Sequence, residues 1–112
     1  MESQVAAQLD SLGVKYSYAS IKLGYEKPAS LHHYTPDFIL PNGLIIEAKG
    51  RFVTADRQKH KLIKEQHPDK DIRFVFSNPN AKIGKKSKTT YAMWCEKYGF
   101  KFAKGLIPKG WL

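Results

Sequence analysis

The chain has 112 residues, with 19 Lys and Arg against 10 Asp and Glu, and carries a formal net charge of +9. This length indicates one domain with a modest core, and the positive charge favours nucleic acid as a partner, although membrane-surface and ribosomal proteins are also basic. The apolar runs are too short to span a bilayer. Cys95 is the only cysteine, which excludes an intrachain disulfide and fits a reducing cytoplasm.

A helix is predicted for residues 1–12, because apolar side chains recur there at helical spacing and Gly13 follows. Glu2 falls on the same face as this apolar stripe. It is either an acid beside the positive end of the helix dipole with no further role, or a side chain that reaches a cleft at the end of the helix. Position alone favours the first interpretation.

Residues 14–21 alternate in polarity and predict a strand. Residues 22–33 follow as a connector without periodicity, and a connector of this length is usually functional or exchanged between chains. It contains His32 and His33. Adjacent residues on an extended chain point in opposite directions, so we expect these histidines to lie in a bridge or face DNA rather than bind a metal.

A β-hairpin is predicted over residues 34–49, with Pro41, Asn42 and Gly43 as a three-residue loop. This loop length pairs Asp37 with Glu47 across the hairpin and places Lys49 on the same face. The opposite face is uniformly apolar and must lie against a core; it consists of Phe38, Leu40, Leu44, Ile46 and Ala48.

Two carboxylates opposed on a sheet repel each other, so the pair Asp37 and Glu47 needs compensation. Mg²⁺ would supply it, because this ion binds through one or two carboxylates together with water and phosphate oxygens. Lys49 would then orient a water or stabilise charge in the transition state. The alternative is a solvated face on which Lys49 only neutralises two surface acids, and the spacing does not decide between the two.

A second helix is predicted for residues 54–66, with Thr54 as its N-cap and a thin apolar stripe. Its remaining face is basic, and its position after Lys49 favours phosphate contact over a merely solvated surface. Residues 78–88 form a lysine-rich loop that either contacts phosphates or is only a mobile surface loop. The candidate DNA-binding residues of this region are Arg51, Arg57, Lys59, His60, Lys64, Lys85, Lys86 and Lys88.

The remaining segments complete an α/β domain. Residues 72–76 predict a central apolar strand, residues 100–103 a last strand, and between them Thr89 or Thr90 caps a helix that ends at Gly99. Cys95 falls in the apolar stripe of this helix, so we expect an inert buried thiol. The predicted fold is a mixed five-stranded sheet flanked by helices, in a single domain of residues 1–112.

Pro36-Asp37, nine further residues and Glu47-Ala48-Lys49 resemble the PD-(D/E)XK nuclease signature. That signature alone is weak, but further segments in the same order make the chain similar, over nearly all its length, to the phage T7-type endonuclease I family of Holliday-junction resolvases. These segments are Lys27-Pro-Ala-Ser30, Tyr34-Thr-Pro-Asp-Phe38, Leu40-Pro-Asn-Gly43, Glu47-Ala-Lys-Gly50, Asp56-Arg57, Glu65-Gln-His-Pro68, Cys95-Glu-Lys97, Lys101-Phe-Ala103 and Leu106-Ile-Pro108.

The resemblance implies a restriction-endonuclease-like fold and a magnesium-dependent endonuclease that resolves four-way and other branched DNA as a domain-swapped homodimer. Residues 1–21 would be exchanged with the partner, residues 22–33 would form the bridge, and residues 34–112 the catalytic body. The implied catalytic residues are Glu2, Asp37, Glu47 and Lys49.

The resemblance also implies one or two Mg²⁺ ions per site, with Mn²⁺ as a substitute, held by Asp37, Glu47, the Ala48 carbonyl and Glu2 of the partner subunit. They would activate a water for hydrolysis that leaves 5′-phosphate and 3′-hydroxyl ends. Branch shape and phosphate positions, more than bases, would be recognised.

Three other functions stay open: a nicking endonuclease on duplex or mismatched DNA, a non-catalytic nucleic-acid-binding module, and a ribosome-associated structural protein. The expected setting is the cytoplasm of a bacterial cell, with the protein encoded by the host or by a phage. No membrane partner and no organic cofactor are expected.

Overall fold

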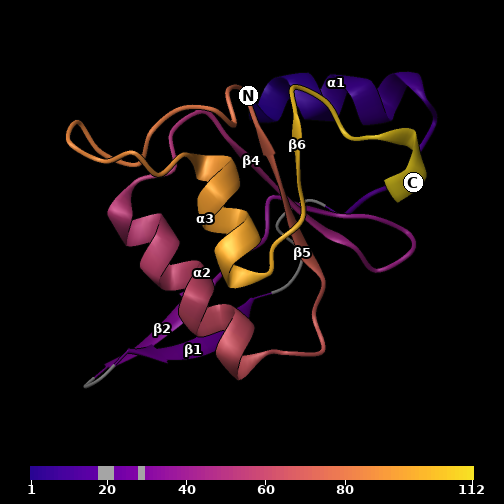
Figure 1. Ribbon diagram of the computed structural model, residues 1–112. Helices are drawn as coiled ribbons and strands as arrows, with labels where there is room; N and C mark the ends of the chain where they lie inside the picture. The colour runs from indigo at the N-terminus through magenta and orange to yellow at the C-terminus, as the bar shows by residue number, and fades with distance from the viewer. Residues whose placement is uncertain (18–21, 28–29) are drawn as a thin grey trace.

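The computed structural model describes residues 1–17, 22–27 and 30–112 (Figure 1). Within this part, four strands in succession follow the first helix, and helices and strands alternate only after them. In chain order they are α1 (Glu2–Ser11), β1 (Leu23–Lys27), β2 (Ser30–Tyr34), β3 (Phe38–Ile39), β4 (Ile45–Lys49), α2 (Thr54–Gln66), β5 (Ile72–Phe76), α3 (Tyr91–Tyr98), β6 (Phe102–Lys104) and a short 3-10 helix, η1 (Lys109–Trp111).

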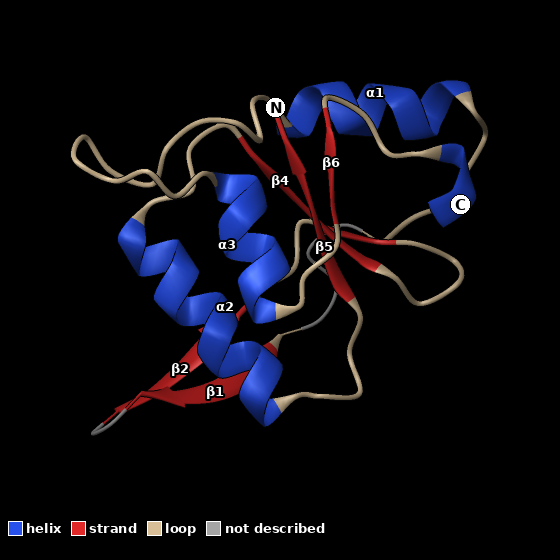
Figure 2. Ribbon diagram, viewed as in Figure 1, coloured by secondary structure: helices blue, strands red, loops and turns tan. Residues whose placement is uncertain are grey.

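The main sheet has the strand order β3-β4-β5-β6, with β3 antiparallel to β4 and the other neighbours parallel. Helices α2 and α3 lie side by side on one face, and α1 lies on the other (Figure 2). Successive residues of a strand face opposite sides, so β4 contributes Ile45 to the core under α2 and α3, and Ile46 to the core under α1. The domain therefore has two hydrophobic cores separated by the sheet.

The central hairpin has the predicted register. Phe38 pairs with Ile46, the Leu40 N–H donates to the Leu44 carbonyl at 2.9 Å, and Gly43 has φ 88°, a conformation that a residue with a Cβ rarely adopts. The apolar face of the hairpin lies in the core under α1, as predicted, where it meets Val5 and Leu9 of that helix.

The prediction of a single five-stranded sheet is wrong for the described residues. Four strands form the main sheet, and β1 and β2 form a separate two-stranded hairpin. Of the strand predicted for residues 14–21, Ser17 exchanges two backbone hydrogen bonds with Ile39 of β3, at 3.0 and 3.1 Å. Residues 18–21 lie outside the described part of the chain.

The segment predicted to be an irregular connector, residues 22–33, instead carries most of the β1-β2 hairpin, which projects beside α2 (Figure 1). Tyr25 stacks on His32, with ring centroids 5.6 Å apart. The backbone N–H and carbonyl of Glu26 bond the side-chain amide of Gln66, both at 2.7 Å. The two-residue periodicity was difficult to recognise because each strand has only five residues, although Tyr25 and Tyr34 on one face of the hairpin are buried in the core under α2 and α3.

Helix boundaries follow the sequence signals in part. Thr90 caps α3, since its hydroxyl accepts a hydrogen bond from the Met93 N–H, and Gly99 ends this helix with φ 77°. The predicted capping role of Thr54 is wrong: α2 begins after Val53 without a side-chain cap, and the Thr54 hydroxyl accepts instead from the Arg57 guanidinium.

Helix α1 packs on the sheet of its own chain. The Gln8 side-chain amide donates to the Ile107 carbonyl and accepts from the Ile107 N–H, both at 2.8 Å, which fixes the helix to the C-terminal segment. Val5 and Leu9 are fully buried. The exchange of residues 1–21 between chains remains a prediction. Among the described helices none has the length and apolar character needed to cross a membrane.

Candidate active site

The candidate site lies where β4 ends, on the face of the sheet that α2 covers. Alternation along β4 directs Glu47 and Lys49 to this face, while Ile46 and Ala48 face the core under α1. Asp37 lies just before β3, directly across the hairpin. The sequence prediction that these three side chains come together is consistent with this register.

The carboxylates of Asp37 and Glu47 each accept a hydrogen bond from a backbone N–H of the opposite strand segment. The Asp37 N–H donates to Glu47 Oε2 at 2.7 Å, and the Ala48 N–H donates to Asp37 Oδ2 at 3.1 Å. Each carboxylate thus has one oxygen fixed by the opposite strand. The second oxygen of each is left for other groups.

The environment of Asp37 disfavours its charged form. Burial, the neighbouring Glu47 carboxylate and, more weakly, Glu2 raise the pKa of Asp37 to about 6, against the lowering effects of the Ala48 N–H and Lys49. Glu2, at the first residue of α1, is therefore close enough to act on Asp37 within one chain. The structure brings all four predicted catalytic residues to one end of the sheet.

Glu47 is ionised in spite of its burial. Its side chain is only 2% exposed, and burial alone would raise its pKa; His60, the Asp37 N–H and Lys49 together hold the pKa below its usual value. The site thus pairs a fixed anion, Glu47, with a carboxyl group, Asp37, whose proton is held more tightly than usual.

Lys49 lies between two acids. Its Nζ is 4.0 Å from Glu47 Oε1 and 3.9 Å from Asp56 Oδ2, and the other oxygen of Asp56 lies 3.9 Å from Lys59 Nζ. Sequence reasoning gave Asp56 no role. The available signal was its place in the first turn of the helix that follows Lys49, which directs its carboxylate toward the end of β4.

His60 and Tyr34 form a buried wall behind Glu47. His60 Nε2 lies 3.4 Å from Glu47 Oε1, and the Tyr34 and His60 rings meet edge-on with centroids 5.2 Å apart. Burial, then Glu47, raises the pKa of Tyr34, so its phenol is neutral. Burial lowers the pKa of His60 more than Glu47 raises it, so the imidazole is neutral at pH 7.

Two residues that the sequence assigned to an exposed DNA-binding surface are buried in the structure. His60 is fully buried and Arg57 is 9% exposed, with its guanidinium donating to the Phe52 carbonyl and to the Thr54 hydroxyl. The buried residues of α2 are Arg57, His60 and Ile63. The predicted apolar stripe is therefore present in part, with Ile63 buried and Leu62 packed against the core, but two polar side chains extend the buried face. Partly or fully exposed candidates are Arg51, Lys59, Lys64, Lys85, Lys86 and Lys88.

The donor chemistry of the site fits a hard divalent cation. Asp37 and Glu47 supply carboxylate oxygens whose mutual repulsion a cation would relieve, and Mg²⁺ usually takes one or two carboxylates and completes its shell with water and phosphate oxygens. Among the described residues, no three His, Cys, Asp or Glu side chains are grouped closely enough to form a protein-only metal site. Ligation by the Ala48 carbonyl and by Glu2 stays a prediction.

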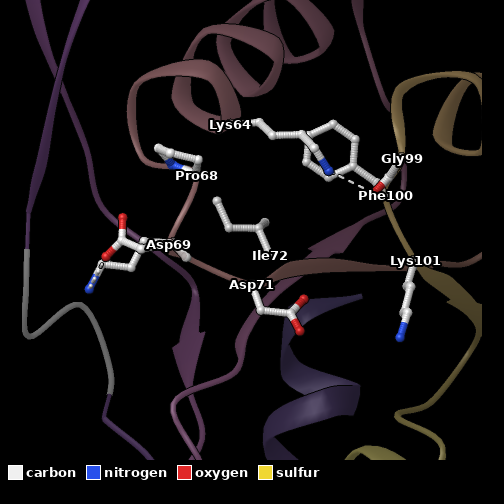
Figure 3. Close-up of a pocket in the computed structure, with 9 residues that line it drawn as sticks. Lys64, Pro68, Asp69, Asp71, Ile72, Gly99, Phe100 and Lys101 are labelled. Atoms are coloured by element: carbon white, nitrogen blue, oxygen red, sulfur yellow. Dashed lines mark hydrogen bonds and ion pairs between the residues drawn. The ribbon is translucent and has the colours of Figure 1, made fainter.

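A hollow of about 300 Å³ lies elsewhere, around Lys64, Asp71 and Lys101 (Figure 3). Asp71 precedes β5, whose first residue pairs with Ile45, whereas Lys49 pairs with the last residue of β5. The hollow is therefore about 13 Å from the catalytic end of the strands. Lys64 is already engaged there, donating to the Gly99 carbonyl at 2.7 Å, so this hollow is not part of the site.

An Asp, Glu and Lys group at one end of a mixed sheet, in a strongly basic chain, is typical of a nuclease. Comparison with known proteins supports this class. Over residues 1–112 the chain matches the family described as phage endonuclease I. It therefore belongs to the phage endonuclease I family, whose members are nucleases and thus hydrolases.

Two phage proteins show the extent of the similarity. "Endonuclease I" of Escherichia phage T7 is 52% identical over 112 residues, which cover all of this chain and 75% of that protein. "Endodeoxyribonuclease 1" of Enterobacteria phage T3 is 52% identical over 108 residues, which cover 96% of this chain and 71% of the phage T3 protein.

Proposed function

We propose that the protein is a metal-dependent endodeoxyribonuclease that resolves four-way and other branched DNA junctions by paired phosphodiester hydrolysis. The observation that carries this proposal is the placement of Asp37 opposite Glu47 in a partly buried site, where burial and, after it, the Glu47 carboxylate raise the pKa of Asp37 to about 6. Fixed, mutually repelling carboxylates beside a lysine are useful for binding a cation and costly otherwise. The name of the phage T3 relative supports DNA as the substrate.

Each residue of the site has a role in this proposal. Asp37 and Glu47, with the Ala48 carbonyl and Glu2, would hold one or two Mg²⁺ or Mn²⁺ ions, which supply Lewis acidity and an activated water when bound. The backbone N–H groups of Asp37 and Ala48 fix the carboxylates. Lys49, placed between Glu47 and Asp56, orients the attacking water or stabilises charge on the phosphate. The product ends would be 5′-phosphate and 3′-hydroxyl.

The basic surface would bind the DNA backbone around this site. The chain carries +9, and the exposed lysines of the loop 78–88 lie apart from the folded core, where phosphates can reach them. A four-way junction requires two cuts, so we propose a homodimer with two sites related by a two-fold axis. Exchange of residues 1–21 would then bring Glu2 of the partner subunit to the place that Glu2 takes in one chain here.

Cleavage of a labelled four-way junction tests this function. The substrate is incubated beside a linear duplex of the same sequence, with and without Mg²⁺, using the wild type, Glu47→Gln and the surface control Asp69→Asn. We expect paired cuts near the branch that need Mg²⁺, persist in Asp69→Asn and disappear in Glu47→Gln. Equal cutting of the duplex would instead favour a nicking endonuclease, and binding without cleavage would favour a non-catalytic module.

A further inference from the structure

His60 is a polar side chain at a buried position where an apolar side chain would destabilise the fold less. It is fully buried between the aromatic rings of Tyr34 and Phe74, with centroid distances of 5.2 and 4.9 Å. Within the described part of the chain, neither of its ring nitrogens has a hydrogen-bond partner of good geometry, and the same holds for the Tyr34 hydroxyl. A buried polar atom left in this state destabilises the folded protein, because it has lost its hydrogen bonds to water without replacement.

Among the charged groups of the described residues that act on His60, the Glu47 carboxylate of the candidate site has the largest effect, ahead of Lys59 and Lys49. His60 Nε2 lies 3.4 Å from Glu47 Oε1, at the outer limit of hydrogen-bond distance, and a shift of about 0.5 Å would complete the bond. Glu47 Oε2 is already fixed by the Asp37 N–H. With both contacts made, the plane of the Glu47 carboxylate is defined at both oxygens.

We infer that His60 is a positioning residue of the active site: from α2, its imidazole N–H holds Glu47 Oε1 and so fixes how this carboxylate faces the metal and the scissile phosphate. The inference rests on the metal-binding role proposed for Glu47. In this role His60 would contact Glu47 and would not itself contact the metal or the DNA. Groups that orient a ligating side chain in this way typically change metal affinity or activity by about 10–100-fold when they are removed.

Two substitutions of His60 distinguish the effect of its N–H group from the effect of the volume of its ring. His60→Leu fills a similar space without a donor, and His60→Gln keeps an amide N–H that reaches about as far as Nε2. Phe74→Leu is the matched control, because it removes a ring that packs on His60 in the same core and leaves the imidazole N–H in place.

Metal binding without DNA is the first measurement, by calorimetric titration of Mn²⁺ into each variant. For His60→Leu we expect Kd to rise about tenfold or more, with His60→Gln close to the wild type. Phe74→Leu is expected to lower the melting temperature without changing this Kd. In single-turnover cleavage the His60→Leu rate falls about 10–100-fold at saturating DNA, while junction affinity in EDTA is unchanged.

Several results would overturn the inference. It fails if His60→Leu binds Mn²⁺ like the wild type, if Phe74→Leu weakens binding equally, or if a folded His60→Gln behaves like His60→Leu. If His60→Leu does not fold, ¹⁵N NMR spectra of the wild type and of Glu47→Gln test whether His60 contacts Glu47. The His60 Nε2–H resonance is expected to shift on removal of the carboxylate charge, and an unchanged resonance refutes the contact.

The same experiments distinguish this inference from the proposed function. If the wild type binds Mn²⁺ but cuts no DNA, the proposed function fails, while a His60-dependent Kd keeps the positioning role. If the wild type cuts junctions and His60→Leu cuts them equally well, the proposed function holds and the positioning role fails.

Discussion

Replacing Asp37 by Asn is expected to stabilise the metal-free protein at pH 7 while abolishing cleavage. Asp37 is partly buried beside Glu47, and its pKa of about 6 means that ionisation is opposed by the folded structure. Asn has nearly the same shape, and its side-chain oxygen can still accept the Ala48 N–H that Asp37 Oδ2 accepts at 3.1 Å. The substitution therefore removes the unfavourable charge and keeps the hydrogen bond.

The magnitude follows from linkage between protonation and folding. A pKa of about 6 in the folded protein, against the usual 3.8, corresponds to about 3 kcal/mol at 1.36 kcal/mol per unit. Solvent screens this partly exposed carboxylate, so we expect about 1–2 kcal/mol. For a domain of this size that is a rise of about 4–8 °C in the melting temperature.

Because the pKa of Asp37 is raised on folding, the stability of the wild type depends on pH. Because the folded protein binds the Asp37 proton more tightly than the unfolded chain, the wild type loses this stability as pH rises from about 4 to about 6. Asp37→Asn loses none of it. In EDTA the variant is thus more stable at pH 7, and the difference disappears near pH 4.

Urea unfolding at pH 4 and pH 7, in EDTA, measures both values, with the exposed Asp69→Asn as a control that changes neither. The reasoning is refuted if Asp37→Asn is no more stable than the wild type at pH 7, or if its advantage is the same at both pH values. Added Mg²⁺ provides a further check, since it is expected to stabilise the wild type more than the variant.

Three further predictions concern residues around the site and on the surface. Asp56→Asn removes a partly exposed ion pair of Lys49, so the single-turnover cleavage rate is expected to fall about fivefold at most, and a much larger loss would assign Asp56 a direct role. Lys86→Gln is expected to reduce the slope of log Kd for DNA against log salt concentration by up to about 0.9, whereas Lys70→Gln, at the other end of the strands, leaves it unchanged. Burial raises the pKa of Cys95 to about 12, so iodoacetamide is expected to label it far more slowly in native buffer than in urea, and equal rates would contradict its burial.

The hairpin that carries the site could be predicted because its determinants are local. Pro41, Asn42 and Gly43 define a three-residue loop, the loop defines the register, and the register places Asp37 opposite Glu47. Alternation then separates the apolar face from the charged face without any knowledge of the rest of the chain.

The surroundings of the site could not be predicted in the same way, because they depend on how α2 lies against the sheet. By composition, Arg57 and His60 belong to a basic helix surface, yet both face the sheet. The signal was weak: Arg57, His60 and Ile63 recur at intervals of three, and a helix with few apolar residues must bury some polar ones. Only tertiary packing shows that the buried polar positions meet Glu47 and the Phe52 carbonyl.

The two carboxylates divide their tasks by burial. Glu47 is enclosed by His60, Lys49 and a backbone N–H, which keep it ionised in an interior that would otherwise protonate it. Asp37 lies nearer to solvent with fewer compensating contacts, and its ionisation is opposed first by its partial burial and then by Glu47. A cation in the site would bind to the Glu47 carboxylate, which is already ionised and fixed. It would also stabilise the ionised form of Asp37, because its positive charge offsets the repulsion between the two carboxylates.

This arrangement couples metal binding to the protonation of Asp37, so metal affinity is expected to rise with pH through about 6 and then level off. Titration of Mn²⁺ at pH 5 and pH 8 measures this dependence. Equal affinity at both pH values would show that metal binding does not require the ionisation of Asp37.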